Sequence, residues 1–276
     1  MAQTIACANQ KGGVGKTTTV VNLASALAAA DRRILVIDLD PQGNATSGFG
    51  VDRASLTASV YDAVIDDVLL GDLIVATSAE GVDLVPAAIA LAGAEVELAS
   101  ADARERRVHR MIKRLDHDYD LIIIDCPPSL GLLTINALTA ADAVLIPLQC
   151  EYYALEGLTQ LLATVDLVRD HLNPRLAIEG VVLTMADGRT NLSAEVAAEA
   201  RRHLGNLVYE TVIPRSVRLS EAPSHGLPIG RYAPESQGAR AYAELAAEFV
   251  ARHPLTTSVD PVPVPVRSER EAAVLA

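Results

Sequence analysis

A glycine-rich stretch near the amino terminus carries the residue types that bind phosphate. Residues 11–18 read Lys-Gly-Gly-Val-Gly-Lys-Thr-Thr and come shortly after an apolar run. Glycines leave backbone N–H groups free to converge on phosphate oxygens, and a helix that begins at the loop adds its positive amino-terminal end. Lys16 can then reach the β- and γ-phosphates of ATP, and the Thr17 hydroxyl can ligate Mg²⁺. We therefore predict a loop for Mg-ATP formed by Lys11, Gly12, Gly13, Val14, Gly15, Lys16, Thr17 and Thr18.

The use of lysine in the chain supports this prediction. The loop departs from the common pattern of such loops, because Gln10 stands where the first glycine is expected. However, Lys11 and Lys16 are two of only three lysines among 23 Lys and Arg residues, and the third is Lys113. A compact ammonium that contacts phosphate as a point charge is a role that Arg does not duplicate. This bias favours phosphate binding over a glycine-rich turn that merely joins a strand to a helix.

Carboxylates end two other apolar runs. Asp125 follows Leu-Ile-Ile-Ile, and we predict it as the second Mg²⁺ anchor, acting through a metal-bound water, rather than as a cap of the next helix. Asp38 and Asp40 end another run, and alternation along a strand places both on the same side. Asp40 lies nearer the edge and is the candidate to position the attacking water. Asp38 is left open between supporting the loop and supporting the metal's water shell.

These residues need a scaffold that brings the ends of several strands together. Apolar, β-branched runs predict strands at 4–8, 34–39, 82–86, 121–125, 143–148, 177–184 and 207–213. Helical patterns occur at 16–30, 101–115 (with a basic face), 154–171, 193–204 and 238–253. The alternation predicts an α/β class, a single-domain P-loop fold with a mostly parallel twisted sheet flanked by helices on both faces. Ligands bind such sheets at the carboxyl ends of the strands, so the candidate residues should share one edge.

Composition agrees with one globular domain inside the cell. We expect the ATPase domain to span residues 1–253, and residues 254–276, which contain Pro-Val-Pro-Val-Pro, to form a flexible tail. Three cysteines without CxxC spacing indicate buried thiols rather than a disulfide or metal site. No leader precedes the first strand, and no apolar run approaches the roughly 20 residues that span a bilayer. We therefore expect a cytoplasmic protein.

Charge is unevenly distributed along the chain. The formal net charge is −12, yet the segment 189–240 holds seven Arg and five Glu, so it carries +2 and the remainder −14. For a polyanionic partner this distribution matters more than the sum. The signal is weak by itself, because arginines also occupy solvated helix faces.

The motifs resemble those of the ParA/Soj chromosome-partition ATPases. This family belongs to the deviant-Walker group, which also contains MinD and the nitrogenase iron protein. The resemblance extends over residues 4–253 and is carried by the segments 9–18, 38–46, 125–129, 151–157 and 215–225. The first segment is shared across the wider group, and the others point to the partition branch.

The resemblance implies a homodimer that sandwiches two ATP molecules. Lys11 would be the signature lysine, which reaches the phosphates of the ATP bound by the other subunit. Gly12 would lie at the closest approach of the two copies. The adenine would lie near Pro214 and Ser216. Catalysis would then rest on Lys11, Lys16 and Mg²⁺, which offset the developing charge, and on Asp40, which orients the water.

The resemblance also implies non-specific binding of the ATP dimer to double-stranded DNA. The matching basic positions are Arg189 and Arg218, with Arg215 and Arg202 as further candidates. Such binding consists mainly of phosphate neutralisation and should weaken steeply with salt. A ParB-type centromere-binding partner would accelerate slow hydrolysis and release the protein. The implied location is the cytoplasm, in association with the nucleoid.

Two other readings belong to different classes. A MinD-like membrane-surface regulator would need a basic amphipathic carboxyl-terminal helix, whereas residues 267–276 are short and of mixed sign, so we expect no membrane partner. An iron protein would need two cysteines at the subunit junction, and Cys7, Cys126 and Cys150 do not suggest such a pair. The sequence leaves open the replicon (chromosome or plasmid), the hydrolysis rate, the partner-binding surface and the role of the tail.

Overall fold

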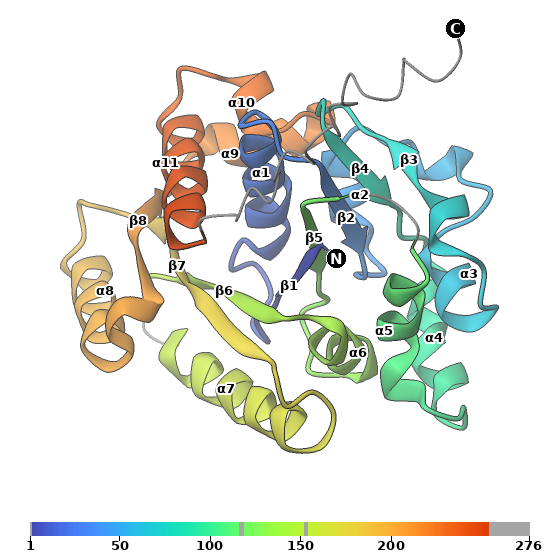
Figure 1. The fold of residues 1–276 in the computed structure, drawn as a ribbon. Helices are drawn as coiled ribbons and strands as arrows, with labels where there is room; N and C mark the ends of the chain where they lie inside the picture. Colours follow the sequence, from blue (N-terminus) through green and yellow to red (C-terminus); the bar gives the residue numbers. More distant parts are fainter. Residues whose placement is uncertain (1, 116–118, 152–153, 254–276) are drawn as a thin grey trace, which may run out of the picture.

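One twisted sheet organises the chain. The computed structural model describes residues 2–115, 119–151 and 154–253. Within them, eight strands lie in the order β3-β4-β2-β5-β1-β6-β7-β8 (Figure 1), and every neighbouring pair is parallel except β3 with β4. The strands are β1 (Gln3–Cys7), β2 (Ile34–Asp38), β3 (Val75–Ala76), β4 (Val82–Val85), β5 (Leu121–Asp125), β6 (Ala143–Gln149), β7 (Ala177–Ala186) and β8 (Val208–Pro214).

The central strands are apolar because both faces of the sheet are covered. All five residues of β2 and of β5 are buried, as expected for parallel strands between two helical layers. The register pairs Asp125 with Cys7 of β1 and with Asp38 of β2. Three strands therefore end side by side, and the residues that follow them meet at one edge.

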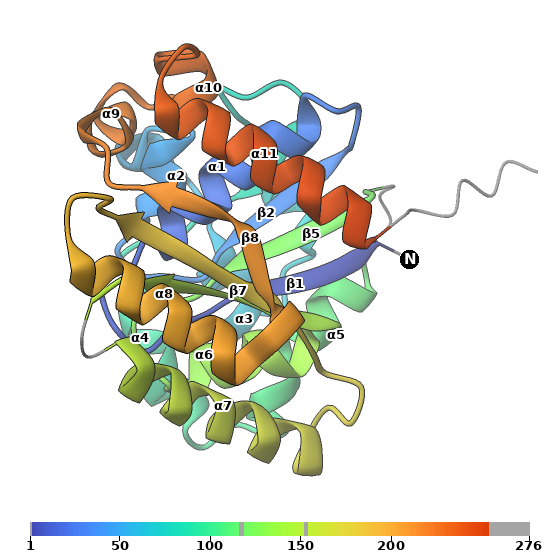
Figure 2. The same ribbon diagram turned by 90° about the vertical axis from the view of Figure 1, so that its left-hand side faces the viewer.

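Helices cover the two faces as separate layers (Figure 2). One layer holds α1 (Lys16–Ala28), α2 (Asn44–Gly48), α9 (Val217–Glu221), α10 (Ile229–Tyr232) and α11 (Gln237–Arg252). The other holds α3 (Val60–Ile65), α4 (Leu91–Leu98), α5 (Arg107–Lys113), α6 (Leu132–Ala140), α7 (Ala154–His171) and α8 (Asn191–Leu204). Apolar residues at helical spacing produce this burial; α11, for example, buries Tyr242, Leu245 and Phe249.

The predicted fold class is confirmed, and the predicted strands end within two residues of the observed ones. The helix expected at 101–115 is wrong in its extent. Ala103 has a φ of 49°, which an α-helix cannot contain, so only a 3₁₀ turn (Arg104–Arg106) and α5 form there. Neither the strand β3 nor the short helices α2, α3, α4, α6, α9 and α10 were predicted from the sequence. The expected tail, residues 254–276, lies outside the described residues, and no described helix has the length and apolarity needed to cross a bilayer.

Candidate nucleotide and magnesium site

The glycines of the loop differ in their backbone conformation. Gly13 and Gly15 have φ values of 75° and 90°, a left-handed conformation that strains any residue with a side chain. Gly12 has no such φ, and a Cβ added there would meet only Pro128, at 3.8 Å. Within one chain, a Cβ at position 12 is therefore tolerated, so neither backbone conformation nor close packing requires glycine there.

The loop opens onto the uncapped start of α1. Gly15 precedes the helix and supplies no side-chain cap, so the first N–H groups of α1 are available to an anion. Lys16 as a residue is buried, and its ammonium donates to the carbonyl of Lys11 at 3.3 Å. A cavity of about 420 Å³ lies in front of these groups. Its lining includes Gly12, Gly13, Gly15, Lys16, Thr17, Thr18, Asp40, Gln42 and Asn44.

Thr17 and Asp125 form the candidate magnesium site. The Thr17 hydroxyl donates to Asp125 Oδ2 at 2.7 Å, although the two residues are 108 positions apart. Asp125 is fully buried, and its Oδ1 has no hydrogen-bond partner among the described residues. Burial raises the pKa of Asp125, and the nearby charges of Asp38 and Asp40 raise it further. A buried, orphaned carboxylate oxygen beside a hydroxyl fits Mg²⁺.

The remaining magnesium ligands would come from phosphate and water. No three His, Cys, Asp or Glu side chains in the described part of the chain are placed to hold a metal by themselves. This is the expected donor set for Mg²⁺, which keeps water and binds substrate phosphates rather than filling an all-protein cage.

Asp38 and Asp40 differ in their contacts. Asp38 Oδ2 accepts from the backbone N–H of Thr46 at 2.8 Å and from its hydroxyl at 2.7 Å, and burial raises the pKa of Asp38 to about 6. These bonds hold the segment that begins at α2, which favours loop support over the water shell for Asp38. Asp40 instead lines the cavity and accepts from the N–H of Gln42 at 2.9 Å. The position of Asp40 is therefore compatible with its predicted role, which is to position the attacking water.

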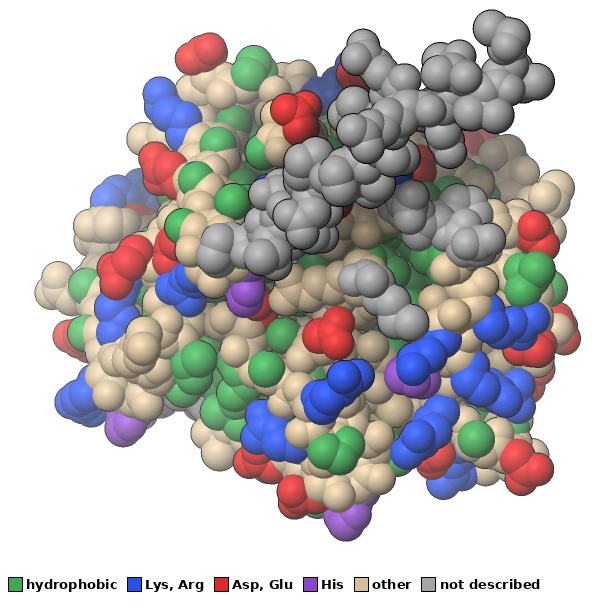
Figure 3. Space-filling model, in the orientation of Figure 1, with side chains coloured by type: hydrophobic (Ala, Val, Ile, Leu, Met, Phe, Trp, Pro, Cys, Tyr) green, Lys and Arg blue, Asp and Glu red, His purple; other side chains and the backbone are tan. Residues whose placement is uncertain are grey.

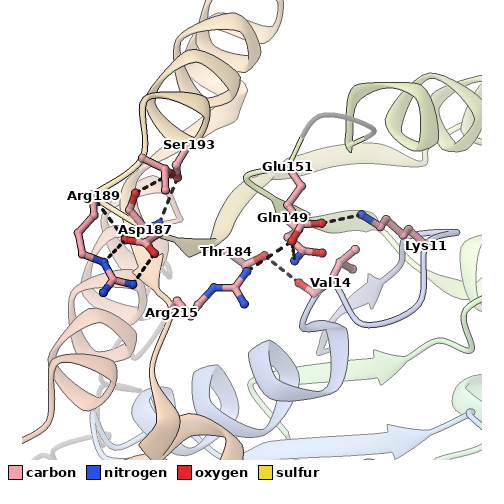
Figure 4. Close-up of polar contacts among 10 residues, drawn as sticks. Lys11, Val14, Gln149, Glu151, Thr184, Asp187, Arg189, Ser193 and Arg215 are labelled. Atoms are coloured by element: carbon pink, nitrogen blue, oxygen red, sulfur yellow. Dashed lines mark hydrogen bonds and ion pairs between the residues drawn. The ribbon is translucent and has the colours of Figure 1, made fainter.

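Lys11 does not line this cavity. Its ammonium lies 3.2 Å from Glu151 Oε2, and the other oxygen of that carboxylate accepts from Gln149 at 2.6 Å and from Arg215 at 3.4 Å (Figure 4). The Lys11 and Glu151 side chains are 36% and 44% exposed, so the pair is open to solvent and to exchange. The two lysines of the loop therefore face different surroundings: Lys16 faces the chain's own cavity, and Lys11 faces outward.

A second cavity adjoins the first. It measures about 300 Å³, includes Pro214 and Ser216 in its lining, and shares Gly15, Thr18 and Met185 with the first cavity. This placement suits the adenine position that the sequence predicted, and the assignment itself stays a prediction. Val14 differs from its neighbours, because its side chain is buried and its carbonyl accepts from the hydroxyl of Thr184 at 2.8 Å.

The four arginines predicted to bind DNA do not form a single cluster. Arg189 lies in the β7–α8 loop, and the backbone of Arg215 bonds to Ala186 at the end of β7. Arg218 lies three residues further, in α9. Arg202 is near the other end of α8, 13 residues from Arg189, a helix length of roughly 20 Å. All four are ion-paired within the chain: Arg189 with Asp187, Arg202 with Glu199, Arg215 with Glu151 and Arg218 with Glu221.

Several residues at the site escaped the sequence reasoning. Gln42 and Asn44 line the cavity and belong to the segment 38–46, so that motif already held the signal. Glu151 likewise opens the segment 151–157. Met185 lines both cavities and has a φ of 52°, which is rare for a residue with a side chain. No sequence pattern around it predicts this conformation.

The three cysteines are free and buried, as expected. Cys7 and Cys126 lie at the ends of β1 and β5, and burial raises the pKa of both thiols. Neither presents sulfur at a surface where two copies could share a cluster.

Comparisons with known proteins agree with this geometry. A family model described as an AAA domain matches residues 2–178. The chain is 59% identical over 251 residues to the sporulation initiation inhibitor protein Soj of Bacillus subtilis, which covers 91% of this chain and 99% of that protein. It is 50% identical over 250 residues to the chromosome partitioning protein ParA of Caulobacter vibrioides, with 90% and 94% covered.

Two solved structures resemble the fold over most of its length. One is cobyrinic acid a,c-diamide synthase from Mycobacterium smegmatis with a bound ATP analog and magnesium, at 42% identity, a TM-score of 0.78, and 90% of this chain and 93% of that chain covered. The other is the septum site-determining protein MinD from Pyrococcus horikoshii with Mg-ADP, at 30% identity, a TM-score of 0.75, and 90% and 96% covered. Both proteins hold an adenine nucleotide with magnesium.

Proposed function

Because the chain belongs to the ParA/Soj family of chromosome-partitioning P-loop ATPases, we propose that it is an ATP-driven switch for DNA segregation. Two copies close on two Mg-ATP molecules, and the dimer binds double-stranded DNA of the nucleoid without sequence preference. A ParB-type partner accelerates hydrolysis, after which the copies separate and leave the DNA. Identity to the Caulobacter chromosome partitioning protein ParA is 50%, compared with 42% to the Mycobacterium synthase and 30% to MinD, which favours partitioning over the functions that the latter two names describe.

The site residues divide the work of hydrolysis. The N–H groups at the start of α1 and the ammonium of Lys16 bind and orient the β- and γ-phosphates. Thr17 and Asp125 hold Mg²⁺, which neutralises phosphate charge when bound. Asp40 lies in the same cavity and orients the attacking water. Asp38 keeps the segment that carries Asp40 in place through its bonds to the backbone.

The observation that most directly supports the proposed dimer is the outward position of Lys11. Lys16 already serves the chain's own cavity, whereas Lys11 is absent from its lining and pairs with an exposed carboxylate. Gly12 lines the nucleotide cavity and adds no side chain between the loop and a second copy. A triphosphate concentrates more negative charge than Glu151, so Lys11 can exchange one for the other at a small cost. Cations at the junction offset the repulsion between two facing nucleotides.

The DNA contact is assigned to Arg189, Arg215 and Arg218, with Arg202 as a more distant candidate. The partners of Arg215 and Arg218 are exposed, and exposed ion pairs contribute about 0–1 kcal/mol each, so DNA phosphates can replace them. Arg189 itself is 87% exposed, although its two bonds to the half-buried Asp187 make that pair the strongest of the three. Because the first three surround the nucleotide end of the sheet, closure of the dimer would bring the two sets onto one surface.

DNA retardation with ATP, ADP and no nucleotide tests the proposal. At physiological salt we expect retardation with ATP and none with ADP or without nucleotide, loss of it with Arg218→Glu, and a steep decline as salt rises further. Binding that ignores the nucleotide would contradict the switch. Co-sedimentation with anionic liposomes in the presence of ATP is the companion measurement, and sedimentation there would favour a membrane-surface role instead.

A further inference from the structure

A second set of basic side chains lies far from the site described above. Arg106, Arg110 and Lys113 are spaced by four and three residues, so they project from one side of α5 and the turn before it. Arg175, from the loop between α7 and β7, completes the group that we call the α5 cationic face. All four side chains are exposed, and blue side chains gather over α5 in Figure 3.

This face has no carboxylate partner in the part of the chain that the structure describes. Among the described residues, none of its four cations is ion-paired, whereas every arginine assigned to DNA above has a carboxylate partner. Burial lowers the pKa of the nearby His109, and the charges of Lys113, Arg106 and Arg175 lower it further, against the opposing effect of Asp142. Lys113 and Arg175 also line a shared cavity of about 200 Å³. Positive potential therefore accumulates here in a chain of net charge −12.

The face lies at the opposite end of the sheet from the nucleotide. Its cavity is lined by Thr4 near the start of β1 and by Asp142 just before β6, whereas the phosphate loop follows the end of β1. Five strand residues, roughly 17 Å, separate the two ends. Two copies joined through their nucleotides would thus carry one such face at each outer end.

The composition of the face favours nucleic acid over a protein segment. Protein interfaces rest on aromatic or apolar anchors, and the exposed large apolar side chains of the described chain (Leu69, Ile89, Val96, Leu167, Leu192 and Val217) are none of the residues that form this face. Non-specific DNA binding needs only flexible cations, which neutralise phosphates and release counterions. Along the axis of α5 the cations are separated by roughly 6 and 4.5 Å, so all of them can lie against one phosphate backbone.

We propose that the α5 cationic face is a second binding surface for the phosphate backbone of double-stranded DNA. It is remote from the nucleotide, so its contribution is independent of ATP. A single copy therefore binds DNA weakly at low salt through this face, and the ATP dimer adds the arginines near the nucleotide. The inference shares its ligand with the proposed function but rests on different residues.

The test compares two double variants that remove the same charge. Arg110→Gln with Lys113→Gln removes unpaired cations of the face, and Arg104→Gln with Arg114→Gln removes cations that are paired to Glu105 and Asp67. Binding of a labelled duplex is measured by fluorescence anisotropy against salt, with ATP and without nucleotide. Each lost phosphate contact should reduce the slope of log affinity against log salt concentration by about 0.9. Between 50 and 200 mM salt, the fold-decrease in affinity should therefore be about ten times smaller for the first variant than for wild type.

The outcomes separate this inference from the proposed function. If wild type shows no ATP-dependent DNA binding, the proposed switch is wrong. If wild type and the first variant show the same salt slope, only the proposed role of the α5 cationic face is wrong. A Gly12→Val protein should keep the weak low-salt binding and lose it when Arg110 and Lys113 are also changed. If the first variant keeps duplex binding and instead loses binding of a labelled oligoglutamate peptide, the surface belongs to an acidic protein partner and the proposal is wrong. Circular dichroism and Mg-ATP calorimetry confirm that each variant is folded.

Discussion

The pairing of Lys11 with Glu151 makes a quantitative prediction about dimerisation. In the single chain this ion pair holds the lysine that we propose to act across the dimer, so neutralising the carboxylate with Glu151→Gln should favour dimerisation. Pairs as exposed as this one contribute about 0.2–1 kcal/mol. Because each dimer requires two lysines to be released, the dissociation constant of the ATP dimer should fall by about 2- to 30-fold, the factor that corresponds to twice that energy.

The measurement is analytical ultracentrifugation with a non-hydrolysable ATP analogue over a range of protein concentrations. The gain should shrink as salt rises, because the Debye length falls from about 10 Å at 0.1 M to about 3 Å at 1 M. Glu199→Gln is the matched control, since it neutralises a carboxylate that pairs with Arg202 and His203 away from the loop. A Glu151→Gln protein that dimerises no better than wild type at low salt would show that Glu151 does not compete for Lys11.

Three further predictions concern the nucleotide site itself. Gly12→Val should fold and bind Mg-ATP as a monomer, because a Cβ there makes only an ordinary contact at 3.8 Å; light scattering that shows an ATP-dependent dimer would contradict the assigned geometry. Asp40→Ala should keep ATP-dependent DNA binding and slow phosphate release by about a hundredfold or more, and loss of nucleotide binding in calorimetry would refute its role. Because burial raises the pKa of Asp38 to about 6, its contribution to stability is present below about pH 4 and lost as the pH rises through about 6. Burial also raises the pKa of Asp125, so a proton competes with Mg²⁺ for this carboxylate; the rise in Tm on adding Mg-ATP should therefore increase with pH, and a rise that is the same at every pH would exclude this competition.

Much of the fold was predictable because its signals are local. Short, continuous β-branched runs such as 121–124 favour strands covered on both faces, and their alternation with helical patterns favours a parallel sheet. The region 44–115 was predicted less well. Its helices are short, and α2, for example, is the five residues Asn44–Gly48, stabilised by the contact of Thr46 with Asp38 rather than by helical periodicity.

What the sequence by itself determined is the chemistry of each segment. The glycines, Lys16 and Thr17 of the loop are contiguous, so their order alone dictates a turn of bare N–H groups at the start of a helix. A carboxylate at the end of an apolar strand likewise predicts a polar edge of the sheet, regardless of which strand lies next to it.

What only the tertiary structure decided is which distant side chains meet. Glu151 is 140 residues from Lys11, and Asp125 is 108 residues from Thr17. Their contacts depend on strand order and register, which result from the packing of the whole core and leave no trace in any short window of sequence. The same holds for Arg175, which joins the α5 cationic face because β6 and β7 are neighbours in the sheet. Local patterns set backbone conformation, whereas the global minimum of packing free energy sets proximity.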